Sequence, residues 1–195
     1  MKIIALEGID GTGKTTIFEK LKAYFADDPR VVFAKSPPPP FYEVMADFWE
    51  KPKLERFLFF LTANIYFCSK KDDHKIYVLD RFIFSTYVTH IVSLNRKQKQ
   101  VLKSLLGEID IPKPSKTYLI KSSLSAIQKR LDERNNEIDN KLRSNRAYFE
   151  ELYDQYYGEQ DVNLGQVETL ENENWENFNR NIDVIKQDIE AMRGK

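Results

Sequence analysis

Short apolar runs alternate with segments of helical periodicity along this chain. Four runs of β-branched or other apolar residues predict buried strands: Ile3–Leu6, Val31–Ala34, Ile76–Leu79 and Thr117–Ile120. A fifth strand is predicted at Val167–Leu170. Because helical patterns separate these strands, we expect a parallel sheet with helices on both faces. The predicted fold class is therefore α/β, with five parallel strands.

Three segments carry apolar residues at helical spacing. The first follows the first strand, with apolar positions Ile17, Leu21, Tyr24 and Phe25. The second precedes the third strand, with Leu54, Leu58, Leu61 and Ile65. The third closes the chain, with Phe178, Ile182, Ile185 and Ile189. The middle helix, Leu54–Phe67, is apolar or aromatic on more than one face. Such a helix is buried on two sides. We therefore expect one side to pack on the sheet and the other on a second subunit.

Two segments differ from ordinary connections. Pro37–Pro40 directly follows the second strand and predicts a stiff, shaped loop, because proline joins neither a sheet nor a helix interior. Residues 121–146 have a helical pattern with Leu124, Ile127 and Leu131 on one face, and basic residues outnumber acidic ones seven to four. This excess of positive charge fits either a solvated helix or a lid that faces an anion.

Composition limits the classes of protein to consider. The chain has 195 residues, of which 42% are hydrophobic, and this predicts one folded domain over residues 1–195. Thirty basic residues balance thirty acidic ones, so we expect neither a nucleic acid nor a membrane as partner. The longest apolar run, Phe57–Leu61, is far shorter than the roughly 20 residues of a membrane span. With no targeting signal and one cysteine, Cys68, the expected location is the cytoplasm.

A phosphate-binding loop follows the first strand. Residues 8–16 read G-I-D-G-T-G-K-T-T, which matches G-x-x-x-x-G-K-[ST] at every specified position. The glycines let backbone N–H groups surround a phosphate, and the helix that follows adds its positive end. Lys14 is predicted to reach the β and γ phosphates of ATP, and the Thr15 hydroxyl to bind Mg²⁺. The predicted ATP-phosphate site comprises Gly8, Asp10, Gly11, Thr12, Gly13, Lys14, Thr15 and Thr16.

The third strand ends in a second charged motif, D-R-F-I-F-S at residues 80–85. The carboxyl ends of parallel strands form the edge of the sheet where ligands bind. Asp80 is therefore predicted to hold Mg²⁺ together with Thr15, and Arg81 to clamp a phosphate of the acceptor. His74 and His90 have no second metal ligand at a recognisable spacing, which favours ordinary surface or core histidines.

Taken together, these features resemble the thymidylate kinase family of P-loop nucleoside monophosphate kinases. The resemblance rests on E-G-I-D-G-T-G-K-T-T at residues 7–16, on D-R-F-I-F-S, and on Y-L-I-K-S-S-L-S-A-I-Q-K-R-L-D-E-R at residues 118–134. It implies a P-loop NTPase three-layer sandwich with a helical lid at about residues 121–146. It also implies ATP as co-substrate, Mg²⁺ as cofactor, a nucleoside monophosphate such as dTMP as acceptor, and a homodimer.

The resemblance also implies roles for single residues. Asp10 would bond to the sugar hydroxyl of the acceptor, and Arg81 would hold the acceptor phosphate. Arg130 and Arg134, which share a helix face at an i, i+4 spacing, would close over the transferred phosphoryl group. The predicted catalytic residues are Lys14, Arg81, Arg130 and Arg134. The same lid would include Asp139, Arg143 and Arg146.

The acceptor side departs from the family pattern. Thymidylate kinases usually carry R-E-P after the second strand, and this chain has Lys35, Ser36 and Pro37. The family's base-reading F-x-x-[DN]-R aligns with residues 61–65, where leucine and isoleucine replace the aromatic residue and the arginine. Phe60 is a neighbouring aromatic that can stack on the base instead. We therefore expect no strong preference for thymidylate. The predicted acceptor site comprises Asp10, Lys35, Phe60, Asn64, Arg81 and Ser85.

Two other functions compete with a monophosphate kinase. A nucleoside kinase must remove a proton from a hydroxyl and should carry a carboxylate near the end of the second strand. Ser36 occupies that neighbourhood, and Glu43 is the nearest acid downstream. A non-catalytic nucleotide-binding switch would have no use for Arg81 or for the arginines of the lid. The presence of these arginines favours the enzyme.

Overall fold

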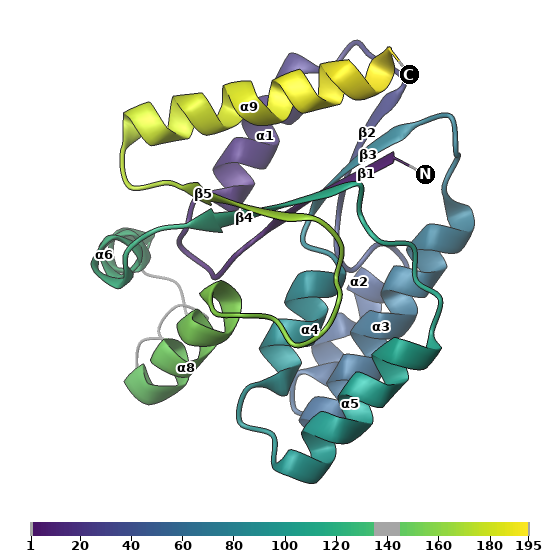
Figure 1. The fold of residues 1–195 in the computed structure, drawn as a ribbon, viewed down its shortest axis with the longest axis vertical. Coiled ribbons are helices and arrows are strands. Elements are labelled where there is room, and N and C mark those ends of the chain that lie inside the picture. The colour runs from purple at the N-terminus through teal and green to yellow at the C-terminus, as the bar shows by residue number, and fades with distance from the viewer. Residues whose placement is uncertain (1, 135–144, 195) are drawn as a thin grey trace.

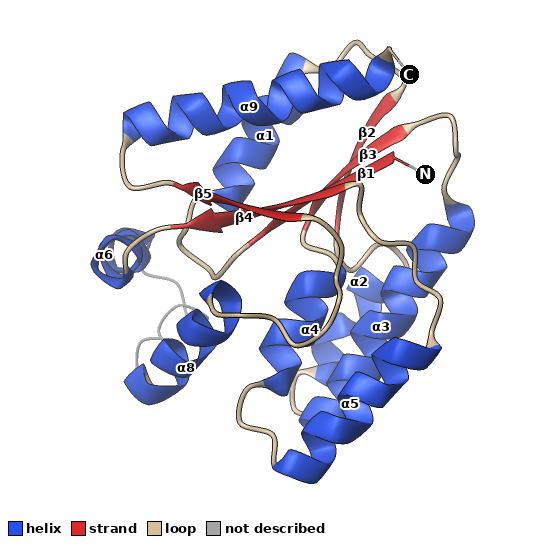
Figure 2. Cartoon of the chain, in the orientation of Figure 1, coloured by secondary structure: helices blue, strands red, loops and turns tan. Residues whose placement is uncertain are grey.

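A five-stranded parallel sheet forms the middle layer of the molecule (Figures 1 and 2). The computed structural model describes residues 2–134 and 145–194. The strands lie in the order β2-β3-β1-β4-β5, all parallel, with bounds β1 (Lys2–Glu7), β2 (Val31–Lys35), β3 (Ile76–Asp80), β4 (Lys116–Lys121) and β5 (Val167–Glu171). The predicted α/β class and all five predicted strands, including the fifth, are confirmed.

Helices cover both faces of this sheet, as the sequence predicted (Figure 1). α1 (Lys14–Tyr24) and α9 (Trp175–Arg193) lie on one face. The other face carries α2 (Phe41–Val44), a 3₁₀ turn (Met45–Phe48), α3 (Lys53–Lys70), α4 (Ile83–Ile91) and α5 (Arg96–Glu108). α6 (Leu124–Arg134) and α8 (Arg146–Tyr157) lie beside the edge toward which β4 points. The three-layer sandwich is therefore confirmed.

Each face of the sheet has its own hydrophobic core. On the side of α1 and α9, fully buried Leu21 and Ile185 pack with side chains of the strands. On the other side, Phe57 of α3 and Tyr87 of α4 are fully buried in a second cluster that extends to α8. Strand residues alternate between the two clusters, as Ile3 and Ile4 do. The sheet is thus held rigidly, and its edge offers a fixed platform.

The predicted lid needs a correction at its start. Lys121 is the last residue of β4, and the helix begins only at Leu124. Ile127 and Leu131 of α6 are fully buried in the core, so this stretch packs against the body of the protein. Asp139 and Arg143 lie outside the described residues. Arg146 opens α8 and pairs with Glu150 at 2.8 Å.

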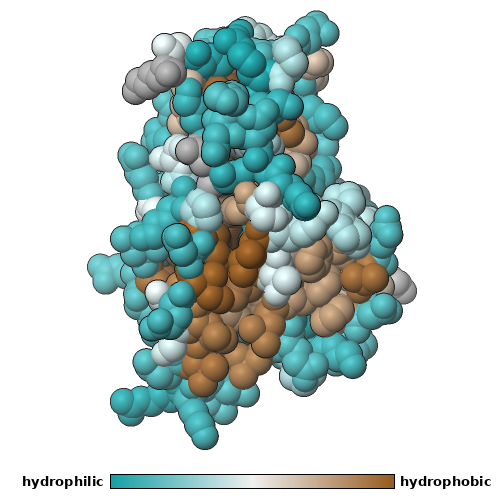
Figure 3. Space-filling model, turned by 90° about the vertical axis from the view of Figure 1, so that its right-hand side faces the viewer, coloured by the Kyte–Doolittle hydropathy of each residue, from teal (hydrophilic) through white to brown (hydrophobic). Residues whose placement is uncertain are grey.

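The surface shows one broad apolar region, which Figure 3 places on the side of the molecule formed by α3 and α5. Three large hydrophobic side chains on these helices are exposed: Leu58, Ile65 and Val101. α3 is thus apolar on two sides, as predicted. Across the described ranges, no helix combines the length and the apolar character needed to cross a membrane.

Candidate active site

The phosphate loop lies where β1, the central strand, ends and α1 begins. Three glycines of the loop have positive φ angles, among them Gly11 at 87° and Gly13 at 92°. A Cβ at Gly11 would lie 2.8 Å from Ile127, and one at Gly13 would lie 2.6 Å from the Asn172 amide nitrogen. Both positions therefore need glycine for conformation and for space. They bring α6 and the end of β5 against the loop.

Lys14 is buried at the first turn of α1, and its Nζ donates to the Ile9 carbonyl at 3.0 Å. Burial and the positive charge of Arg81 lower the pKa of Lys14 to about 8. The ammonium group is therefore held inside the loop and still carries its charge at neutral pH. It is placed to meet phosphate oxygens that enter the loop.

Thr15 and Asp80 meet across the gap between the loop and β3. The Thr15 hydroxyl donates to Asp80 Oδ2 at 2.9 Å. A hydroxyl and a carboxylate are both hard oxygen ligands, and Mg²⁺ is usually held by one or two such groups together with substrate phosphates. This donor pair fits Mg²⁺. Nowhere in the described ranges do three or more histidine, cysteine or acidic side chains gather into a metal site.

A cavity of about 460 Å³ opens beside the loop, and Arg81 lines it. The guanidinium of Arg81 joins the phosphate loop, α4 and α8, because it donates to Gly8 O (3.1 Å), Ser85 Oγ (2.9 Å), Tyr156 Oη (3.0 Å) and Asp10 Oδ1 (2.5 Å). Its backbone is left-handed, with φ of 70°. A non-glycine residue in this conformation is uncommon and marks a position that its surroundings enforce.

Glu7, a fully buried residue at the end of β1, supports Arg81 from behind. Its carboxylate accepts the backbone N–H groups of Phe82 (2.8 Å) and Ser85 (3.2 Å) and the Ser85 hydroxyl. Burial raises the pKa of Glu7. Since the Ser85 hydroxyl donates to Glu7, its lone pairs are left to accept from Arg81 and Tyr156. Ser85, a predicted acceptor residue, therefore holds the guanidinium of Arg81 in place.

Asp10 is the sole carboxylate among the described residues that line this cavity. Desolvation would raise the pKa of Asp10, but the charges of Arg81 and Lys14 outweigh it and hold the pKa at about 2. Its side chain keeps 46% of its surface exposed. Asp10 is therefore a permanent anion that accepts hydrogen bonds.

Aromatic side chains and a further guanidinium also line the cavity. Phe60 lines it, as predicted, with Trp49 at 6.4 Å and His90 at 5.4 Å between ring centroids. Arg56, one turn before Phe60 on α3, and Tyr148 of α8 line it as well. The cavity therefore combines charged groups beside the phosphate loop with flat aromatic rings.

Several predicted acceptor residues lie elsewhere. Lys35 pairs with Glu19 at 2.9 Å and does not line the cavity, so its assignment to the acceptor stays a prediction. Asn64 is buried behind the wall, where it donates to Thr86 at 2.9 Å. Leu61 is a core residue and Ile65 is exposed, and neither faces the cavity. On the same helix, Arg56 and Phe60 are the residues that line the cavity.

The two lid arginines, Arg130 and Arg134, have different surroundings. Arg130 donates to the carbonyls of Gly11 (3.3 Å) and Asn172 (2.8 Å) and to Ser122. It ties α6 to the phosphate loop and to the end of β5. Arg134 lines the cavity beside the phosphate loop, together with Asp10 and Arg81.

Four residues of the site are not predicted by the sequence: Glu7, Arg56, Tyr148 and Tyr156. They are far apart in the chain and meet only when β1, α3 and α8 assemble. The sequence predicts an ordinary surface or core histidine at His90, which is indeed buried but also lines the cavity. For Glu7, its place directly before the phosphate loop was the available signal.

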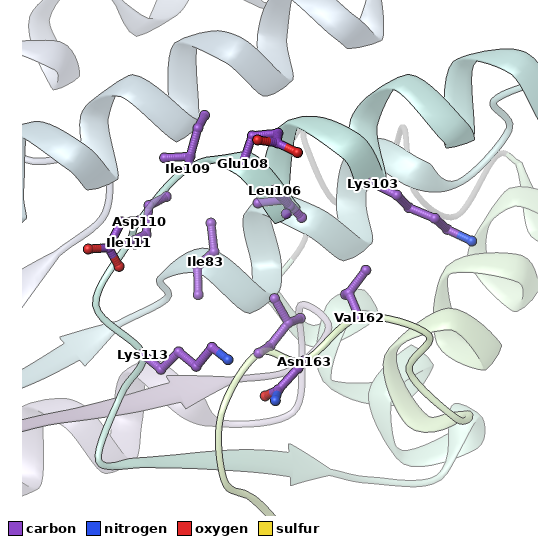
Figure 4. A pocket seen from close by; sticks show the side chains of 12 residues that line it. Ile83, Lys103, Leu106, Glu108, Ile109, Asp110, Ile111, Lys113, Val162 and Asn163 are labelled. Atoms are coloured by element: carbon purple, nitrogen blue, oxygen red, sulfur yellow. The ribbon is translucent and has the colours of Figure 1, made fainter.

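A second cavity, of about 530 Å³, lies between α5 and the segment before β5 (Figure 4). Apolar side chains, including Ile83, Leu106 and Val162, form its interior, while Lys103 and Lys113 lie at its rim. None of the predicted site residues lines it. Of these two cavities, the first is therefore the one that predicted site residues line.

The strand order, the loop after the central strand and the neighbouring cavity define a P-loop nucleotide kinase. The thymidylate kinase family model matches residues 6–182. The chain belongs to the thymidylate kinase family, whose members are ATP-dependent nucleoside monophosphate kinases. Among curated proteins, none matches this sequence.

Solved structures agree on the fold. A thymidylate kinase from Ehrlichia chaffeensis has a TM-score of 0.66 at 20% identity, covering 95% of this chain and 98% of that one. A thymidylate kinase from Candida albicans has 0.74 at 16%, covering 98% and 92%. A deoxyadenosine kinase from M. mycoides has 0.71 at 16%, covering 97% and 99%. Kinases of nucleosides and of their monophosphates thus share this fold, and only the site can separate them.

The lowered pKa of Lys14 predicts how ATP binding depends on pH. Lys14 loses its proton as pH rises through about 8, so ATP should bind progressively more weakly between pH 8 and pH 10. Titration calorimetry at several pH values measures this. A Lys14→Arg variant, which stays charged throughout, should bind with a flatter pH profile. Equal slopes in the two proteins would exclude Lys14 as the titrating group.

Proposed function

We propose that this chain transfers the γ-phosphoryl group of ATP, in the presence of Mg²⁺, to the phosphate of a nucleoside monophosphate. The observation that carries the proposal is the position of Arg81. Its guanidinium touches Gly8 of the phosphate loop and also lines the acceptor cavity. An anion in the cavity would therefore meet the donor phosphates beside one fixed positive charge.

Each part of the site has a role in this reaction. The loop N–H groups and Lys14 hold the donor phosphates. Thr15 and Asp80 would hold Mg²⁺, which neutralises charge on the donor's phosphates when bound. Arg81 holds the acceptor phosphate, and Asp10 accepts a hydrogen bond from a sugar hydroxyl of the acceptor. Arg134, which lines the cavity, is the arginine that we assign to the transferred group, while Arg130 fixes α6 over the loop.

A monophosphate suits this site better than a free nucleoside. An acceptor phosphate is already an anionic nucleophile, whereas a hydroxyl must lose a proton to a base. The carboxylate of Asp10 is a poor base, because its pKa is about 2 and it is paired with Arg81. Glu43 is exposed on α2 and lies outside the cavity lining. This favours the monophosphate kinase over the nucleoside kinase.

A non-catalytic switch explains less of the molecule. Such a protein needs the phosphate loop but has no use for a second, aromatic cavity that opens beside it. The joint presence of Arg81 and Arg134 in that cavity favours transfer to an acceptor.

The direct test is a panel of nucleosides and their monophosphates assayed with Mg-ATP for ADP release. We expect turnover with monophosphates and only background with nucleosides. Lys14→Ala should lower turnover by at least about a hundredfold, because it removes a preorganised charge at the phosphates. Lys20→Ala, an exposed position on the same helix, is the matched control and should behave as wild type. Phosphorylation of nucleosides instead, or Lys14→Ala turnover within threefold of wild type, would reject the assignment.

We also propose that two chains associate through the apolar region over α3 and α5. Leu58 and Ile65 are two turns apart on one face of α3 and are 46% and 41% exposed, and Val101 of α5 is 44% exposed. Water-exposed aliphatic side chains on neighbouring helices fit the buried centre of an interface. We expect a second copy of this chain to cover the surface, because two such apolar surfaces are complementary to each other.

The dimer prediction is tested by light scattering at micromolar concentration. We expect the wild-type protein to be dimeric and Leu58→Asp to be monomeric, since a carboxylate in the apolar contact would lose its hydration. Trp175→Asp, at a 74% exposed position on α9, should remain dimeric. A monomeric wild-type protein would overturn this proposal without touching the catalytic one.

A further inference from the structure

Helix α8 contacts both halves of the proposed site through two neighbouring rows of side chains. Tyr148, Leu152 and Tyr156 are spaced four residues apart, and all three line the cavity beside the phosphate loop. Tyr153 and Tyr157 form the adjacent row, and their hydroxyls donate to carbonyls in the last turns of β4 and directly after it. In Figure 1 the C-terminal end of α8 lies against the loop that joins β1 to α1. One helix therefore reaches both the donor loop and the acceptor cavity.

Tyr156 holds the guanidinium of Arg81. Its side chain is almost fully buried, and its hydroxyl accepts from Arg81 Nη1 at 3.0 Å while it donates to Ser85 Oγ at 3.0 Å. Burial raises the pKa of Tyr156 to about 12, so the hydroxyl keeps its proton at physiological pH. A neutral acceptor orients one nitrogen of the guanidinium and leaves the positive charge available to an anion.

Tyr157 holds the backbone of the phosphate loop. Its hydroxyl donates to the Ile120 carbonyl of β4 at 2.8 Å and accepts from the backbone N–H of Ile9 at 3.4 Å. The Ile9 carbonyl in turn accepts from Lys14 Nζ at 3.0 Å and from the Thr12 hydroxyl at 2.9 Å. Ile9 is thus held at its N–H by α8 and at its carbonyl by the lysine of the loop. A change at the Tyr157 hydroxyl therefore reaches Lys14 through one residue.

The space around Gly8 shows how closely the loop lies against Tyr157. A Cβ at Gly8 would clash with the Ile120 carbonyl oxygen and would lie 3.2 Å from the Tyr157 hydroxyl oxygen. The end of β4 and this hydroxyl therefore form a wall on which the loop rests. Removing the hydroxyl and keeping the ring opens this wall by one atom.

We propose that two adjacent tyrosines position the two halves of the site separately. Tyr156 positions Arg81 for the acceptor phosphate. Tyr157 positions Ile9, and through it Lys14, for the phosphates of ATP. This inference rests on the proposed function and names positioning residues of that same site. Because the two hydroxyls belong to different rows of one helix, the loss of each should weaken the binding of a different ligand.

The test is a series of three tyrosine-to-phenylalanine variants on α8. Calorimetry gives the dissociation constants of Mg-ATP and, separately, of dAMP, dCMP, dGMP and dTMP. Tyr156→Phe should weaken the binding of monophosphates by about 3- to 10-fold, the range for one net hydrogen bond, and leave that of ATP within about twofold. Tyr157→Phe should weaken the binding of ATP by about 3- to 10-fold and leave that of monophosphates within about twofold. Tyr153→Phe, whose hydroxyl donates to the Ser122 carbonyl at 3.1 Å, is the matched control and should change neither.

A double variant shows whether Tyr156 acts through Arg81. In the background of Arg81→Met, adding Tyr156→Phe should weaken the binding of monophosphates by less than about twofold, because the group that the hydroxyl holds is already gone. A further loss as large as that of Tyr156→Phe alone would mean that the hydroxyl acts independently of Arg81 and would overturn the positioning role.

The outcomes separate this inference from the proposed function. Turnover of monophosphates with Mg-ATP, combined with losses that each variant spreads over both ligands, would overturn the inference alone. Unchanged binding in Tyr156→Phe or in Tyr157→Phe would do the same. If no monophosphate binds or reacts, the proposed function fails and the role of Tyr156 fails with it, whereas the binding of ATP still decides the role of Tyr157. Melting temperatures equal to that of wild type show that the variants are folded.

Discussion

The contacts of Arg81 are the constraint on which the rest of the site depends. One guanidinium bonds to the phosphate loop at Gly8 and Asp10, to Ser85 of α4 and to Tyr156 of α8. These elements come from opposite ends of the chain, and each contributes a wall of the cavity. The left-handed backbone of Arg81 is stabilised because the Glu7 carboxylate accepts hydrogen bonds from the backbone N–H groups of Phe82 and Ser85. The position of one positive charge thus fixes where an acceptor anion can lie.

The cavity beside the phosphate loop brings charged and aromatic groups together. Arg81, Asp10 and Arg134 line it, and so do Trp49 and Phe60. In the proposed function, the charged groups hold the phosphate and the sugar of a nucleoside monophosphate, whichever base it carries. The aromatic side chains offer a flat surface for the base.

The parts of the molecule that depend on local sequence could be predicted from it. The strands follow from apolar runs, and the pairing of Thr15 with Asp80 follows from strand ends meeting at one edge of a parallel sheet. What failed was the orientation of single side chains. Lys35 is the last residue of β2, but its ammonium pairs with Glu19, and Asn64 donates to Thr86 and does not line the cavity, whereas the predicted Phe60 does. Arg56 and His90 line the same cavity only through packing of α3 on α4, which no local pattern records.

The central claim, that Arg81 holds the phosphate of the acceptor, is tested most directly by calorimetry without ATP. Binding of one nucleoside and of its monophosphate is compared in wild type and in Arg81→Met. Wild type should bind the monophosphate about 10- to 100-fold more tightly than the nucleoside, because a charged hydrogen bond is added. Arg81→Met should bind the two with nearly equal affinity. If the variant keeps the full advantage of the monophosphate, the acceptor phosphate lies elsewhere and the account of the site is wrong.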